Sequence, residues 1–139
     1  MNMPHELGSI LIIIHPPLAI LGYLFTFLAA WNMGKLLFRR KDRKRDNRDF
    51  GLSLAVAWWL TFLGLVTGMI WAQVAWGSFW SWDPKETAAL AVFVTLTIVY
   101  VMNLRELPLK VQAPFMAVNI LSILYTISIS FLSIGLHSF

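Results

Sequence analysis

Histidines and closely spaced tryptophans are the residues of this chain best suited to chemistry. Four of its seven tryptophans, Trp71, Trp76, Trp80 and Trp82, lie within one short stretch. His15 directly precedes a proline pair, and the other two histidines are His5 and His137. Imidazole is a common axial ligand of haem iron, and indole faces offer apolar area and offset stacking to a porphyrin. These residue types suit a non-covalent haem b site, provided that the fold brings them together.

The tryptophan stretch ends in a well-defined helix start. Asp83 is the expected N-cap, Pro84 the first helical residue and Glu86 the third, which is an Asp-x-x-Glu capping box. Gly77 allows the backbone to turn before it, and Phe79 adds a further ring to the predicted aromatic platform. We therefore interpret Asp83 and Glu86 as capping residues without a catalytic acid–base role.

The same helix start offers two ways of meeting the propionate groups of a haem. Backbone amides near Asp83 lie at a helix N-terminus, where anions are stabilised. Lys85 is either a second propionate partner or a cation whose side chain extends to the membrane surface. The residue types do not separate these two roles for Lys85.

Composition places the chain in a membrane. It has 139 residues, of which 58% are hydrophobic and 13% charged, and its mean hydropathy is +0.69. A soluble domain of this size needs more polar surface. There is no cysteine, which excludes a thioether link to a cofactor, an iron–sulfur site and a disulfide. We expect one compact domain over residues 1–139.

Four apolar runs predict an all-α, four-helix transmembrane bundle with helices at about residues 16–38, 50–75, 84–104 and 114–135. Each run is close to the ~20 residues that cross a bilayer. Proline disfavours helix in the preceding residue and suits the first turn. The first helix is therefore expected to start at Pro16, with His15 at its mouth. The alternative is a helix that starts near Leu7 and kinks at the prolines.

The basic residues predict the orientation. Ten of the eleven Lys and Arg residues are Lys35, the seven within residues 39–48, Arg105 and Lys110, whereas Lys85 lies on the other side. By the positive-inside rule the two basic loops are cytoplasmic, and the tryptophan loop and both termini are outside. The start of the chain lacks a basic segment, so we expect the first helix to be retained. The basic loop lacks interleaved aromatics, so it does not indicate nucleic-acid binding.

Less specific interpretations apply to the same residues. Tryptophans gather at membrane interfaces, a histidine at a helix end is often a cap, and His5 alone is assigned no role. Small residues recur at steps of three or four in the first two helices, which favours close helix packing. They are Ala19, Gly22, Thr26, Ala30 and Gly34, then Ser53, Ala57, Thr61, Gly64, Gly68 and Ala72. A polar stripe in the fourth helix predicts interhelical hydrogen bonds, through Asn119, Ser122, Thr126, Ser130 and Ser133.

Together these motifs resemble a known family. The segment Trp76-Gly-Ser-Phe-Trp80-Ser-Trp82-Asp-Pro-Lys-Glu-Thr87 closely resembles the WWD signature of the haem-handling proteins of cytochrome c maturation, the CcmC/CcmF/CcsA family, and looks most like CcsA. His15-Pro-Pro-Leu-Ala-Ile-Leu-Gly-Tyr23 and Gly135-Leu-His137-Ser-Phe139 resemble its two outer-side histidine motifs. The family usually has six or more spanning helices, whereas four are expected here.

The resemblance implies haem held at the outer membrane face by the WWD loop and two flanking histidines. The implied site comprises His15 and His137 as axial ligands, with a surrounding set of Trp71, Trp76, Phe79, Trp80, Trp82, Asp83 and Lys85. Haem would pass to apocytochrome c or a haem chaperone. Other maturation subunits of the cytoplasmic membrane are further implied partners. No catalytic residue is assigned, and the chain is at most part of a cytochrome c haem lyase. The alternatives are a haem-bearing electron-transfer subunit and a structural membrane subunit.

Overall fold

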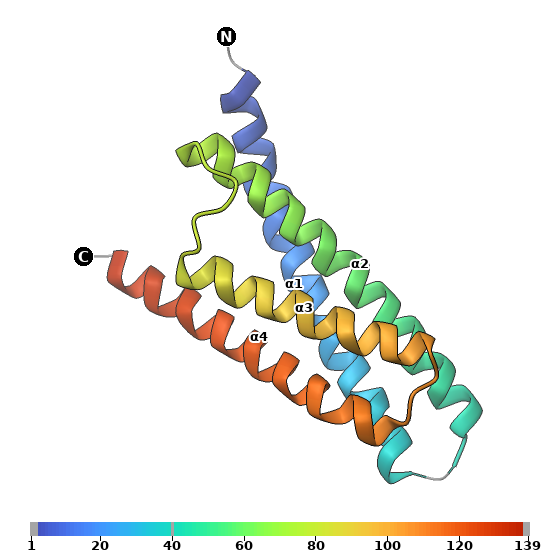
Figure 1. Ribbon diagram of the computed structural model, residues 1–139. Coiled ribbons are helices and arrows are strands. Elements are labelled where there is room, and N and C mark those ends of the chain that lie inside the picture. The colour runs from blue at the N-terminus through green and yellow to red at the C-terminus, as the bar shows by residue number, and fades with distance from the viewer. Residues whose placement is uncertain (1–2, 40, 138–139) are drawn as a thin grey trace. The chain divides into compact units, whose positions relative to one another are not determined.

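The computed structural model describes residues 3–39 and 41–137, with side chains described for residues 6–39 and 41–132. Over these residues the chain forms four α-helices: α1 (Met3–Phe38), α2 (Arg43–Trp76), α3 (Pro84–Leu104) and α4 (Leu109–His137) (Figure 1). Each contains a segment long and apolar enough to cross a membrane. The described part of the chain contains no strand, so the all-α membrane class is confirmed.

The contacts divide the chain into two compact units, Met1–Ser81 and Trp82–Phe139. The first contains α1 and α2, and the second contains α3 and α4. Each unit is an α-hairpin with its own buried residues, and each is described separately below. The single domain expected over residues 1–139 stays a prediction.

Small residues set the contact between α1 and α2. A β-carbon placed on Gly22 would lie 2.9 Å from the Thr61 hydroxyl oxygen, and one on Gly64 would lie 3.4 Å from the backbone nitrogen of Ala19. Near the start of α1, a β-carbon on Gly8 would lie 3.4 Å from Val74. Positions rise along α1 as they fall along α2, so the helices are antiparallel. The predicted small-residue packing is confirmed where Gly22 and Gly64 meet the partner helix, whereas a β-carbon on Gly34 would meet nothing within 4 Å.

The start of α1 differs from the expectation. Pro16 and Pro17 lie inside the helix, which begins at Met3, so the prediction of a start at Pro16 is wrong and the alternative start near Leu7 is closer. The two prolines remove two backbone donors. The segment before them nevertheless packs on α2. Leu11 of α1 is 5% exposed and Ala72 of α2 is 4% exposed. Burial against a neighbouring helix outweighs the local penalty of the prolines.

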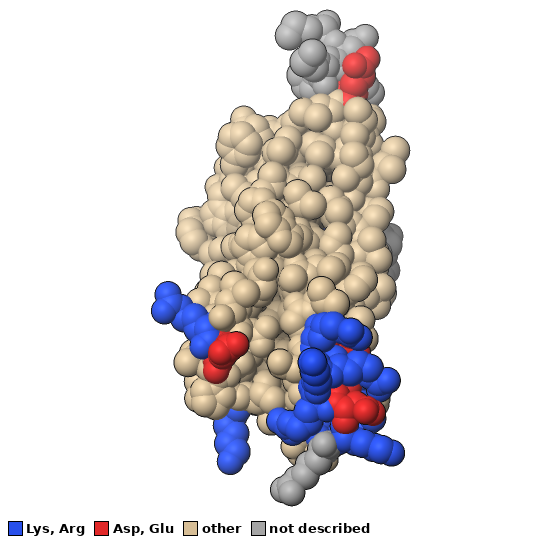
Figure 2. All heavy atoms as spheres, turned by 90° about the vertical axis from the view of Figure 1, so that its right-hand side faces the viewer, with Lys and Arg blue, Asp and Glu red and all other residues tan. Residues whose placement is uncertain are grey.

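A buried ion pair accounts for the early start of α2, which begins at Arg43 rather than near Phe50. The Asp46 side chain is fully buried, and its Oδ1 lies 3.5 Å from Lys35 Nζ. Arg43 also donates to the Leu36 carbonyl at 3.0 Å. These contacts attach the first turns of α2 to the last turns of α1. Figure 2 shows Lys and Arg side chains gathered at this end of the helix pair.

Unit 2 is an antiparallel pair held partly by one amide side chain. The Asn119 amide nitrogen donates to the Val92 carbonyl at 2.7 Å and to the Thr95 hydroxyl at 2.9 Å, across from α4 to α3. Asn119 is fully buried, so the predicted interhelical bonding is confirmed for this residue. Ser122, Thr126 and Ser130 instead donate to carbonyls one turn back on α4, as hydroxyls in membrane helices commonly do.

Helix α4 also begins earlier in the sequence than expected. It begins at Leu109, five residues before Pro114. The Gln112 side chain, 2% exposed, donates to the Leu107 carbonyl at 2.8 Å. This bond attaches the connection between α3 and α4 to the first turn of α4. Pro114 is the sixth residue of α4, so its missing N–H removes one intrahelical hydrogen bond.

Candidate functional site

The tryptophan loop begins where α2 ends. Gly77 has a left-handed backbone (φ 76°), and its N–H donates to the Gln73 carbonyl at 2.9 Å. This is the usual cap of a helix C-terminus, where glycine avoids the penalty of a β-carbon. Beyond it, the Ser78 hydroxyl donates to the Trp80 carbonyl at 2.9 Å. The turn expected at Gly77 is therefore confirmed, and the loop has a defined path.

Asp83 caps α3 as the sequence predicts. Its Oδ1 accepts the Glu86 backbone N–H at 2.7 Å, and Pro84 opens the helix. The residue before the cap, Trp82, has a positive φ of 59°. A bulky residue in that region is uncommon, and the Trp82 side chain is 67% exposed.

The cap is directly testable. Replacing Asp83 by alanine removes the acceptor at the first turn of α3 and is expected to cost about 1 kcal/mol of stability. Asp83→Ser retains a capping oxygen and should stay close to the parent. Thermal unfolding in detergent, followed by circular dichroism, measures both. Equal melting temperatures for Asp83→Ala and the parent would contradict the capping role.

Two of the predicted platform rings contact each other within unit 1. Trp71 and Trp76 pack edge to face, with ring centroids 4.7 Å apart and planes at 85°. Trp76 is 56% exposed and Phe79 51% exposed, whereas Trp80 is half-buried. Trp82 belongs to unit 2. The structure therefore joins Trp71 to Trp76 at the end of α2 and leaves large apolar rings exposed on the loop that follows.

His15 lies inside α1 and contacts α2, so its expected place at the mouth of the helix is wrong. Its Nδ1 is 3.2 Å from the Thr67 hydroxyl oxygen. The ring is half-buried and rests on Gly68, where an added β-carbon would lie 2.9 Å from His15 Cε1. Thr67 is nine residues before Trp76, which is about 14 Å along the helix. His15 therefore contacts α2 well before the helix end from which the aromatic loop starts. Sequence reasoning did not identify Thr67 as its partner.

His137 is the last residue of α4, and its side chain lies outside the described residues, as does that of His5. Asn119 is level with Val92 and Thr95, so α4 continues roughly two and a half turns past the first residue of α3. Lys85 is exposed in the first turn of α3. The ligand role of His137 and the two roles open to Lys85 stay predictions.

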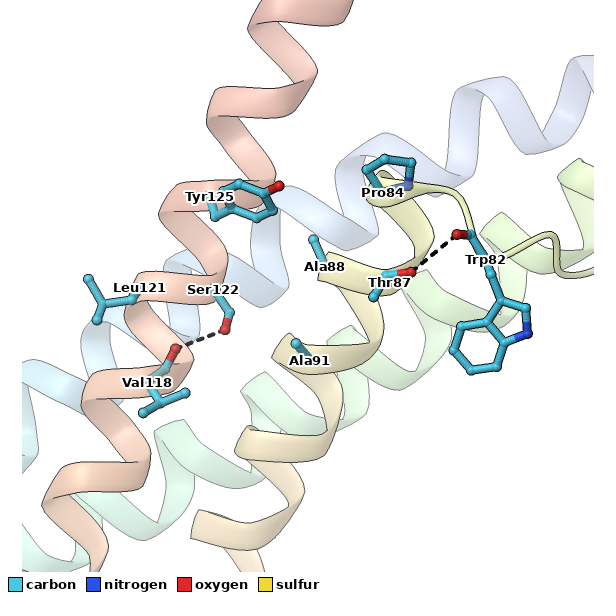
Figure 3. A pocket seen from close by; sticks show the side chains of 9 residues that line it. All are labelled: Trp82, Pro84, Thr87, Ala88, Ala91, Val118, Leu121, Ser122 and Tyr125. Atoms are coloured by element: carbon cyan, nitrogen blue, oxygen red, sulfur yellow. Dashed lines mark hydrogen bonds between the residues drawn. The ribbon is translucent and has the colours of Figure 1, made fainter.

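Unit 2 carries an open groove of about 470 Å³ between α3 and α4. Figure 3 shows Ala88 and Ala91 on the α3 side and Leu121 and Tyr125 on the α4 side, while the indole of Trp82 projects away from α4. The full lining is Trp82, Pro84, Thr87, Ala88, Ala91, Val118, Leu121, Ser122 and Tyr125. Sequence reasoning missed this groove. The signal that it overlooked is the pair of alanines on one face of α3.

Comparisons with known proteins match the chain to one family. The family described as "Cytochrome C assembly protein" matches residues 2–137. Similar proteins include the cytochrome c biogenesis protein CcsA of Prochlorococcus marinus subsp. pastoris, 39% identical over 63% of this chain and 28% of the relative. The CcsA proteins of Gloeobacter violaceus and a Synechococcus species are 35% and 36% identical. These two matches cover 68% and 70% of this chain, and 28% and 32% of the relatives.

The match spans under a third of the length of these relatives. No solved structure matches the chain. The family match nevertheless extends over both helical units, from the start of α1 to the end of α4. With its membrane-length helices, the chain is a multi-pass membrane protein. It is a CcsA-like member of the cytochrome c assembly protein family.

Proposed function

We propose that the chain binds haem b without a covalent bond at the outer face of the cytoplasmic membrane and presents it for attachment to a c-type cytochrome. His15 and His137 would hold the haem iron. The observation that carries the proposal is the His15 ring, which is half-buried between two helices and hydrogen-bonded to Thr67. Such a ring is oriented before any ligand arrives, which lowers the cost of binding.

The residues present fit a haem by their chemistry. Neutral imidazole is a nitrogen ligand for haem iron, and the Trp71–Trp76 pair lies further along the same helix that holds His15 in place. Exposed rings at Trp76 and Phe79 offer apolar faces to a flat ligand. Exposed Lys85 offers a cation to the propionates. The backbone amide of Glu86, in the same first turn, is already bonded to Asp83 Oδ1. Haem supplies the iron-porphyrin group that is transferred.

The orientation of the chain supports an outer site. The seven basic residues within 39–48 lie in the connection between α1 and α2 and in the first turns of α2. Arg105 lies in the connection between α3 and α4, and Lys110 lies in the first turn of α4. If both connections are cytoplasmic, the loop of residues 77–83 is outside. Exposed rings on that loop suit a site that must release its ligand to another protein, because a deeply enclosed ligand leaves slowly.

The chain's own chemistry points to holding and presenting haem rather than bonding it. With no cysteine in the chain, the thiols for a thioether bond come from the acceptor. The proposed partners are apocytochrome c or a haem chaperone, and other membrane subunits of cytochrome c maturation. The similar proteins carry the name cytochrome c biogenesis protein, and any haem lyase activity would require more than the residues of this chain.

The function is tested by two linked measurements. The purified chain, expressed with ample haem, is expected to show a Soret band, and cells lacking the gene are expected to lose covalent haem from c-type cytochromes. A Soret band with normal c-type cytochromes would favour a haem-bearing electron-transfer subunit. Purified protein without a Soret band would favour a structural membrane subunit.

The sidedness is tested separately with single cysteines, since the chain has none of its own. We expect Ser81→Cys, in the tryptophan loop, to react with a membrane-impermeant maleimide in right-side-out vesicles. Lys44→Cys, in the basic segment, should react only after the vesicles are opened. Both positions are exposed, so access to the reagent decides the result. The reverse pattern would contradict the outer site.

A further inference from the structure

We propose that Thr67 and Gly68 on α2 are positioning residues for His15, a role that rests on the proposed haem ligation. Thr67 selects which ring nitrogen carries the proton, and Gly68 leaves the space that the ring occupies. Both residues act from the neighbouring helix, 52 and 53 positions along the chain from the histidine.

The hydrogen bonds of Thr67 determine the direction of its bond to His15. A threonine hydroxyl has one proton to donate and two lone pairs to accept with. Thr67 Oγ1 donates that proton back along its own helix, 2.8 Å from the Leu63 carbonyl and 3.0 Å from the Gly64 carbonyl. With that proton directed to these two carbonyls, the same oxygen is left to accept from His15 Nδ1, 3.2 Å away. We infer from this that the proton of the neutral imidazole resides on Nδ1.

This assignment has a consequence for ligation. In the Nδ1–H form of a neutral imidazole the in-plane lone pair lies on Nε2. A metal-bound histidine commonly donates its other N–H to a carbonyl, carboxylate or water, which sets its tautomer and its orientation. Here the hydroxyl oxygen of Thr67 is the acceptor for the Nδ1–H of His15. The His15 ring is prepared to bind iron through Nε2.

Gly68 determines where the ring can lie. A β-carbon at this position would be 2.9 Å from His15 Cε1 and 3.4 Å from both ring nitrogens. The contact at 2.9 Å is shorter than van der Waals separation allows, so any larger residue displaces the imidazole. The ring therefore lies against the α2 backbone at Gly68, which has no side chain and is one residue beyond Thr67.

The experiment measures haem affinity by titration of the full-length apoprotein in detergent, together with the electron paramagnetic resonance spectrum of the ferric form. Thr67→Val removes the hydroxyl at nearly constant shape and is expected to weaken haem binding about tenfold and shift the spectrum. Thr67→Ser retains the acceptor and should restore both. Thr26→Val is the matched control, because Thr26 is buried in the same helix pair and makes the same bond, to the Gly22 carbonyl at 2.7 Å.

The outcomes separate the two proposals. Weaker binding by Thr67→Val alone, with rescue by serine, supports the positioning role. If His15→Ala weakens binding but Thr67→Val matches Thr26→Val, the positioning role is wrong and the ligation stands. Equal losses in Thr67→Val and Thr67→Ser also overturn it, because the hydroxyl is then not the cause. If His15→Ala binds haem like the parent, the ligation proposal fails and the positioning role fails with it.

Discussion

Replacing either His15 or His137 by alanine is expected to remove most of the haem that co-purifies with the chain. Each substitution deletes one of the two proposed axial bonds and leaves iron with an incomplete coordination sphere. Apolar contacts from the tryptophan loop alone would leave weaker, faster-exchanging binding. The ratio of Soret absorbance to protein, measured at equal detergent concentration after purification, reports the effect directly.

The third histidine provides the matched control. His5 lies near the N-terminal end of α1, ten residues before His15, and His5→Ala is expected to retain the parent's haem. Imidazole added to the buffer should restore part of the Soret band in the His15 and His137 variants, since it can replace the missing ligand. Equal haem loss from all three variants would contradict the assignment, as would full retention after loss of His15 and His137 together.

Gly68→Ala is expected to give the second-largest effect, a loss of haem affinity of about 10- to 100-fold. The added methyl group would lie 2.9 Å from His15 Cε1, so the ring must move or rotate away from Thr67. Alanine is a better helix former than glycine by about 1 kcal/mol. The substitution therefore weakens the ligand without weakening α2, and circular dichroism should show an unchanged helix content.

Gly34→Ala is the control for this prediction. Gly34 lies in α1 of the same pair, and a β-carbon there meets nothing within 4 Å. We expect parent-like haem affinity and an equal or slightly higher melting temperature. If Gly68→Ala and Gly34→Ala bind haem equally well, the ring does not need the space at Gly68, and the proposed geometry of His15 is wrong.

Sequence reasoning identified the features that depend on neighbouring residues. The apolar runs predict membrane helices, and the residue order Asp83-Pro84-Lys-Glu86 predicts the cap that the structure contains. Gly77 marks the turn at the end of α2 because its left-handed backbone favours glycine. These signals are local, so they can be read without knowing which helix packs on which.

The same reasoning failed where packing between helices determines the residue at which a helix begins. It started the first helix at Pro16 because a proline pair disfavours helix in the residue before it, whereas α1 begins at Met3 and its first turns pack on α2. It likewise started α2 near Phe50, since it could not foresee that buried Asp46 would pair with Lys35. In each case a contact far away in the sequence outweighs a modest local preference.

The sequence by itself determined the membrane class, the helix-capping chemistry, the aromatic loop and the motifs by which the family is recognised, because each depends on residue type and short spacing. Only the tertiary structure decided that His15 meets Thr67 and Gly68. That contact depends on the register in which α1 lies against α2, which is set by close approaches such as Gly22 to Thr61 and Gly64 to Ala19. A shift of one residue in that register would turn Thr67 away from the histidine, and no local pattern specifies it.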